Sequence, residues 1–92
     1  MNLIHQQKLS QLLDELIKLD GEVDSKEMFL KTSYEDQMLE IHGNEEGLLA
    51  FAIQVLKLAK GRVAGSHFNY DGASMLDSCE MPFEVVYSSL EN

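Results

Sequence analysis

The chain is poor in the residues that crosslink or interrupt a fold. It has one cysteine, Cys79, one proline and no tryptophan among 92 residues. A lone thiol excludes an internal disulfide, a zinc cluster built on cysteines and a Cys-x-x-Cys redox pair, and it is typical of a reducing compartment. No apolar stretch approaches the ~18 residues that span a bilayer, and residues 1–8 lack the apolar core of a secretory signal. We expect a soluble, cytoplasmic protein without a cofactor.

Basic residues are also scarce. The chain has 7 of them against 16 acidic residues, which gives a formal charge of −9. This charge repels nucleic acid and anionic membranes, and it attracts a basic protein. A negative surface can equally serve solubility alone. Eleven of the acids lie in the first half of the chain, so we expect a basic partner to bind there.

The N-terminal segment has the pattern of an amphipathic helix. Between residues 3 and 19, leucines recur at intervals of three and four positions, at Leu9, Leu12, Leu13, Leu16 and Leu19. Asn2 is the expected cap and Gly21 the expected end. One leucine stripe must cover something, either the sheet of its own domain or a second copy of the chain.

A charged connector over residues 21–25 precedes two short apolar stretches, at 28–30 and 38–42, which we interpret as a β-hairpin. In the second strand Leu39 and Ile41 share one face, and Glu40 and His42 share the other.

A second helix is predicted over residues 45–60, and it is apolar on more than one side. Asn44 is suited to cap it, Glu45 and Glu46 face the positive end of its dipole, and Gly61 can adopt the positive φ that stops it.

Two further strands are expected after this helix. Residues 66–72 alternate and end in the turn pair Asp71-Gly72, whereas 73–81 read as a loop or short strand. Residues 82–90 form the last strand, with Phe83, Val85 and Tyr87 facing the helices. The order αββαββ predicts an α+β fold of one domain, 1–92: a helix over 1–21 and a core over 26–92, with both helices on a mostly antiparallel sheet of three to four strands.

Catalytic machinery is not evident in the sequence. Cys79 is next to Glu80, an environment that does not activate a thiol. His67, Asn69 and Asp71 share one side of a predicted strand, and an exposed polar face accounts for them without a metal ion or an acid–base pair. We therefore expect neither an enzyme nor a metal site.

Three short motifs resemble a family of small immunity proteins that neutralise bacterial polymorphic toxins. They are Gly43-Asn44-Glu45-Glu46-Gly47-Leu48 at the start of the second helix, the strand His67-Phe68-Asn69-Tyr70-Asp71, and the closing Phe83-Glu84-Val85-Val86-Tyr87. The resemblance covers residues 38–88. The chain departs from the family at Asn69, where a second histidine is usual, and at Tyr70, where an aliphatic residue is usual, so no role of a histidine pair is carried over.

The resemblance implies a stoichiometric inhibitor of a cognate, basic toxin domain. We expect two partner-binding patches: Glu35, Asp36, Glu40, Glu45 and Glu46 as the first, and His67, Asn69 and Asp71 as the second. The alternative is a small structural or adaptor domain that dimerises through the leucine stripe or an open sheet edge and has no toxin partner. A small enzyme that uses His67 and Asp71 is the third hypothesis.

Overall fold

The computed structural model describes residues 1–22, 27–71 and 76–89. Two helices and five strands follow in the order α1 (Leu3–Glu22), β1 (Leu30–Glu35), β2 (Met38–Gly43), α2 (Glu45–Gly61), β3 (His67–Tyr70), β4 (Ser78–Cys79) and β5 (Phe83–Val86). The predicted α+β class of a small single domain is confirmed. The additional short strand β4 lies within the segment that was expected to be a loop or a short strand.

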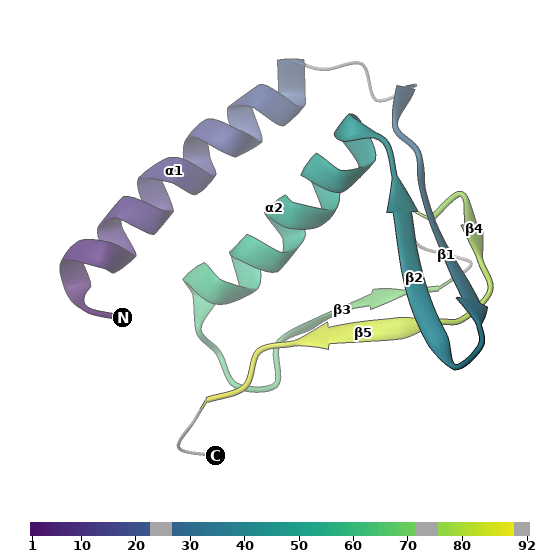
Figure 1. Cartoon of the computed structure of the whole chain (residues 1–92). Helices are drawn as coiled ribbons and strands as arrows, with labels where there is room; N and C mark the ends of the chain where they lie inside the picture. The colour runs from purple at the N-terminus through teal and green to yellow at the C-terminus, as the bar shows by residue number, and fades with distance from the viewer. Residues whose placement is uncertain (23–26, 72–75, 90–92) are drawn as a thin grey trace.

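The strands form two sheets (Figure 1). In the three-stranded sheet the order is β2-β1-β4, with β1 antiparallel to β2 and parallel to β4, whereas β3 and β5 form an antiparallel pair. Mostly antiparallel pairing was predicted correctly, but the sequence pattern did not reveal that the strands divide between two sheets. The reason is that the third strand of the first sheet, β4, comes from the segment between β3 and β5 and pairs with β1, which lies far from it in the sequence.

The first strand was predicted too early and too short. Its expected position was residues 28–30, but β1 runs from Leu30 to Glu35 and takes in the segment expected to connect the strands. The connection is a two-residue turn in which Asp36 and Gln37 both have positive φ, 53° and 62°. Such turns usually contain glycine, and its absence here hid the turn.

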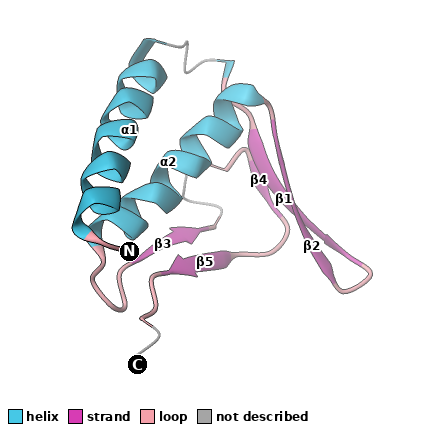
Figure 2. Ribbon diagram, turned by 60° about the vertical axis from the view of Figure 1, so that its left-hand side comes forward, coloured by secondary structure: helices cyan, strands magenta, loops and turns pink. Residues whose placement is uncertain are grey.

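The first helix was predicted correctly over residues 3–19, but it continues through Gly21 to Glu22. Gly21 is therefore a helical residue and does not end the helix. Glycine weakens a helix by only about 1 kcal/mol, and the last turn accommodates it. The rest of the predicted connector, residues 23–25, lies outside the described residues. Leu13 is the one buried residue of α1, and the helix packs mainly against α2. Figures 1 and 2 show α2 lying between α1 and the strands, so α1 covers the second helix instead of the sheet, and Leu12 and Leu19 of the leucine stripe remain exposed.

The second helix begins as predicted. The Asn44 side chain accepts a hydrogen bond from the Gly47 N–H at 2.9 Å, and Glu45 and Glu46 occupy the first turn. Its end differs from the prediction, because Gly61 is the last helical residue. The left-handed position belongs to Arg62, whose φ is 54° and whose N–H donates to the Leu58 carbonyl at 3.1 Å.

The core lies between α2 and the two sheets. Leu30, Tyr70 and Leu76 form its buried centre, and partly buried residues including Phe83 and Val85 pack against it. The Tyr70 and Phe83 rings stack with centroids 4.7 Å apart. The inward orientation predicted for Phe83 and Val85 is thus confirmed. The strands themselves are shorter than expected, and the predicted turn at Asp71-Gly72 includes Gly72, which lies outside the described residues.

Candidate protein-binding surface

One face of the β1–β2 hairpin is buried near the base of β1 and exposed along β2 and toward the turn. In the antiparallel register Thr32 is opposite Ile41 and Tyr34 is opposite Leu39. Near the base, Leu30 and Thr32 are 0% and 1% exposed. Tyr34, nearer the turn on β1, and Leu39 and Ile41, on the outer strand β2, are 43%, 36% and 37% exposed. These last three residues form an exposed apolar surface on a projecting element, which we call the hairpin face.

The opposite side of the hairpin is polar. Ser33, Glu40 and His42 lie together there: the Ser33 hydroxyl donates to Glu40 Oε1 at 3.5 Å and lies 3.2 Å from His42 Nε2. The carboxylate of Glu40 is 3.6 Å from the same ring nitrogen. All these contacts are exposed, so their contribution to stability is small. Their effect is to keep a carboxylate and an imidazole side by side on the outer strand.

Asn44 and Gly47 fix the base of the hairpin to α2. Asn44 Oδ1 accepts from the Phe29 N–H at 3.0 Å as well as from Gly47, and the Asn44 amide donates to the Phe29 carbonyl at 3.2 Å. The Asn44 Nδ2 group donates to the Glu27 carbonyl. A side chain at position 47 would overlap the Phe29 carbonyl. The hairpin therefore leaves the helix in a defined direction.

The segment around β4 binds the backbone groups of β1 that point away from β2. Leu30 N–H donates to Asp77 Oδ2 at 2.7 Å, and Tyr34 N–H donates to Glu80 Oε2 at 2.8 Å. The Glu80 amide in turn donates to the Thr32 carbonyl at 3.3 Å. Sequence reasoning missed this role of Asp77 and Glu80, since acidic residues that bind a distant backbone have no local sequence signal.

The structure spreads the first predicted patch along the hairpin. Glu35 and Asp36 lie at the turn, Glu40 lies in the middle of β2, and Glu45 and Glu46 lie past its far end. A six-residue strand separates the two ends by about 17 Å. Four of these residues are exposed and Glu46 is half-buried. The five carboxylates therefore border the hairpin instead of converging on one point.

The second predicted patch lies on the other sheet. His67 and Asn69 are exposed on β3, and their side of the strand is opposite Phe68 and Tyr70, as predicted. The His67 ring nitrogen Nδ1 is 3.0 Å from the Gly65 carbonyl. Asp71 follows the strand and is half-buried. This patch belongs to a different sheet from the hairpin, so the two patches are separate candidates.

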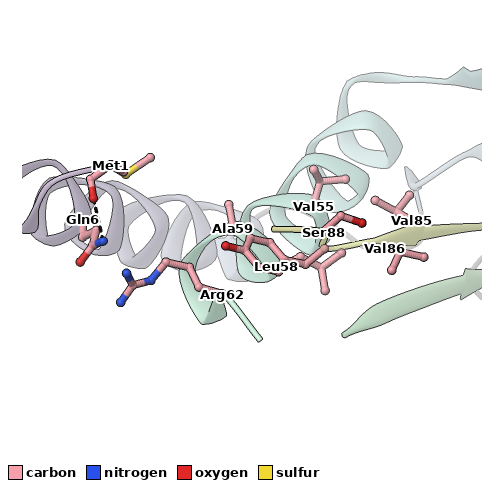
Figure 3. A pocket seen from close by; sticks show the side chains of 10 residues that line it. Met1, Gln6, Val55, Leu58, Ala59, Arg62, Val85, Val86 and Ser88 are labelled. Atoms are coloured by element: carbon pink, nitrogen blue, oxygen red, sulfur yellow. Dashed lines mark hydrogen bonds between the residues drawn. The ribbon is translucent and has the colours of Figure 1, made fainter. Parts of the chain in front are cut away.

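A groove of about 510 Å³ lies between the start of α1, the C-terminal half of α2 and the end of β5. Figure 3 shows its lining, in which Val55, Leu58 and Val85 are apolar and Arg62 brings a positive charge. Gln6 closes part of the rim by donating to the Met1 carbonyl at 2.9 Å. The groove has no cluster of titratable groups in its lining, and no motif in the sequence predicted it.

Burial raises the pKa of the Tyr70 hydroxyl above its ordinary value of 10.0, and this hydroxyl donates to Gln54 Oε1. Cys79 is a half-buried free thiol. Within residues 1–22, 27–71 and 76–89, no three His, Cys, Asp or Glu side chains come together in a group that could hold a metal ion. Neither of the described helices has the length and apolar character needed to cross a bilayer.

In comparisons with known proteins, no family model matches the chain, and no curated protein and no solved structure matches it either.

Proposed function

We propose that this protein is a stoichiometric inhibitor that binds a basic partner protein, in the manner of the immunity proteins of bacterial polymorphic toxin systems. It performs no reaction of its own in this proposal. It acts in the cytoplasm of the producing cell, where it binds a cognate toxin domain and blocks its activity.

One observation carries the proposal: carboxylates border a projecting hairpin, and most of them form no ion pair with a lysine or arginine of the described residues. Within the described residues, no lysine or arginine forms an ion pair with Glu35, Asp36, Glu45 or Glu46. Lys60 instead forms an ion pair with Asp14 at 3.9 Å, which joins the two helices. The carboxylates at this surface are therefore available to a basic partner, and the overall charge of −9 adds a long-range attraction.

Such a surface favours fast and selective association with a basic protein. Complementary charge accelerates encounter, while apolar side chains at the centre of an interface supply most of the affinity. The hairpin offers both, with apolar residues on one face and carboxylates at the turn and the base. A toxin that acts on nucleic acid has a basic substrate groove, and an acidic inhibitor can cover it.

Co-expression with the product of the adjacent gene tests the proposal. We expect growth arrest by that product alone, growth in the presence of this protein, and co-purification of the two in equal amounts. A double variant, Leu39→Lys with Ile41→Lys, places positive charge on the hairpin face and should abolish both protection and co-purification. The absence of toxicity and of a complex would contradict the proposal.

Self-association is a second candidate function, and the exposed flank of α1 favours it. Leu12 and Leu19 are 50% and 47% exposed and lie seven residues apart on one side of the helix. A second copy packed on this flank would bury both. Sedimentation of the wild type and of Leu12→Glu decides the matter: a dimer that Leu12→Glu converts to a monomer supports this candidate, and a wild-type monomer removes it.

A further inference from the structure

From the geometry of the hairpin we infer that the outer edge of β2 binds an extended, basic segment of the partner as an additional strand of the sheet. This inference rests on the proposed function and specifies how the partner is bound. It concerns the backbone of β2 together with the hairpin face formed by Tyr34, Leu39 and Ile41.

The hydrogen bonds of β1 show that the β2 edge is free. Backbone groups of Leu30, Thr32 and Tyr34 bind the segment around β4, so these residues direct their N–H and C=O groups away from β2. In an antiparallel pair the residues opposite them direct theirs away from β1. The partners of Thr32 and Tyr34 are Ile41 and Leu39. Within the described residues no strand pairs with that side of β2.

This edge lacks most of the usual protection against pairing. Natural edge strands are blunted by proline, by charged side chains, above all lysine, by a bulge or by short length, and of these devices β2 has the carboxylate of Glu40, which a basic segment would neutralise. β2 is six residues long, contains neither proline nor lysine, and pairs with β1 without a break in register from Gly43 to Met38. Its side chains from Met38 to His42 are all exposed. A strand added here would form a regular ladder.

The two faces of the hairpin define the side chains of the added strand. Because side chains alternate along a strand, one set would lie beside Leu39 and Ile41 and the other beside Glu40 and His42. Apolar residues fit the first face, and lysine or arginine fits the second. The expected segment therefore alternates apolar and basic residues.

Charge decides between a basic partner and a second copy. Pairing of two β2 strands would follow a twofold axis and bring the same surface together with itself. In an antiparallel pair centred on Glu40, this carboxylate would lie opposite the same carboxylate of the other copy, and the turn with Glu35 and Asp36 would lie toward the other copy's Glu45, which disfavours the pair. A basic segment meets the same groups with opposite charge.

Hydrogen exchange with a probe peptide tests the inference without any variant. The probe is a short capped peptide that alternates lysine and valine. The controls are the same length of alternating glutamate and valine, and of alternating lysine and glycine. In the free protein we expect rapid exchange at the amides of Leu39 and Ile41 and slow exchange at Glu40 and His42. The lysine–valine peptide should slow exchange at Leu39 and Ile41.

A matched pair of variants isolates the backbone contribution. Ile41→Pro removes the outward N–H and leaves the ladder to β1 intact, since proline is tolerated where an edge N–H faces solvent. Ile41→Ala shortens the side chain and keeps the N–H. Measured by titration calorimetry, Ile41→Pro should weaken peptide binding about tenfold more than Ile41→Ala, because main-chain hydrogen bonds supply the affinity in strand addition. Circular dichroism checks that both variants fold.

Several results would overturn the inference. They are protection spread over unrelated amides, equal binding of the lysine–glycine peptide, no binding of the lysine–valine peptide, and a wild-type dimer that Ile41→Pro dissociates. The experiments distinguish a failure of strand addition from a failure of the proposed inhibitory function. If the adjacent gene product still binds Ile41→Pro as tightly as Ile41→Ala, strand addition is wrong and inhibition stands. If the peptide binds as expected and the gene product does not, the edge stands and inhibition is wrong.

Discussion

At Gly47 the first turn of α2 lies directly against the backbone of Phe29, and this contact holds the hairpin to the helix. A Cβ at this position would overlap the Phe29 carbonyl. The other contacts at the junction are the hydrogen bonds of Asn44. A helical residue in close contact with the backbone of another segment has to be glycine.

Replacing Gly47 by alanine should therefore destabilise the protein by about 1–3 kcal/mol, the usual cost of overpacking. Gly61→Ala is the matched control, because Gly61 is also helical and a Cβ there would have no atom within 4 Å. Alanine at 61 should stabilise by about 0.5–1 kcal/mol. Urea unfolding measures both, and equal effects of the two substitutions would refute the close contact.

The protonation of Tyr70 is coupled to folding. Its burial raises the pKa of the hydroxyl above 10.0 in the folded protein. Above about pH 10 the unfolded chain loses this proton while the folded chain retains it, so the folded state binds more protons and stability falls as the pH rises. The stabilisation is complete below that pH.

Tyr70→Phe should flatten the alkaline part of the stability curve. The variant also loses the hydrogen bond to Gln54, which costs about 0.5–1.5 kcal/mol at neutral pH. The two effects separate when urea unfolding is measured from neutral pH to about pH 11. A slope above pH 10 that is the same in wild type and variant would mean that Tyr70 does not titrate as its burial requires.

At the scale of residues, the sequence predicted only what depends on near neighbours. The cap at Asn44 and the acids of the first turn were identified because a helix start has a local signature. The contact of Gly47 with Phe29 and the binding of Asp77 to Leu30 depend on segments far apart in the sequence. No spacing rule predicts such contacts.

At the scale of elements, the hairpin turn holds two consecutive residues other than glycine in the left-handed region. Asp36 and Gln37 both have positive φ, and glutamine is poorly suited to that region. Aspartate tolerates it better, because its short polar side chain can hydrogen-bond locally. The backbone conformation of this turn therefore lowers the stability of the folded protein.

Gln37→Gly should stabilise the protein by about 1 kcal/mol, since glycine removes the cost of the left-handed conformation. Ser33→Gly, a glycine in the interior of β1, is the control and should destabilise by about 0.5–1 kcal/mol. Thermal unfolding of both variants tests this. A lower melting temperature for Gln37→Gly would show that the glutamine side chain supports the turn.

The elements also show which structural features the sequence patterns failed to predict. Both helices were found because their periodicity and caps are local. The strand β1 was misplaced because its turn lacks glycine, and the helix end was misassigned because Arg62 adopts the conformation expected of Gly61. Pairing of β4 with β1 is not encoded in either segment alone.

At the scale of the whole molecule, α2 separates α1 from the strands, and the hairpin extends beyond both helices (Figure 2). The excess of acidic residues was evident from composition. Their arrangement was not, because closeness in sequence suggested one cluster, whereas β2 holds Asp36 and Glu45 at opposite ends. Association with a basic partner is accordingly expected to involve the length of the hairpin.

The salt dependence of partner binding tests most directly whether a basic partner binds along the hairpin. Glu35→Lys and the control Glu15→Lys on α1 change the net charge equally, from −9 by two units. With the adjacent gene product as partner, we expect rising salt to weaken wild-type binding. Glu35→Lys should bind more weakly with a smaller salt dependence, and Glu15→Lys should resemble the wild type. Binding that is independent of salt, or that both variants weaken equally, would contradict a hairpin-centred, charge-complementary interface.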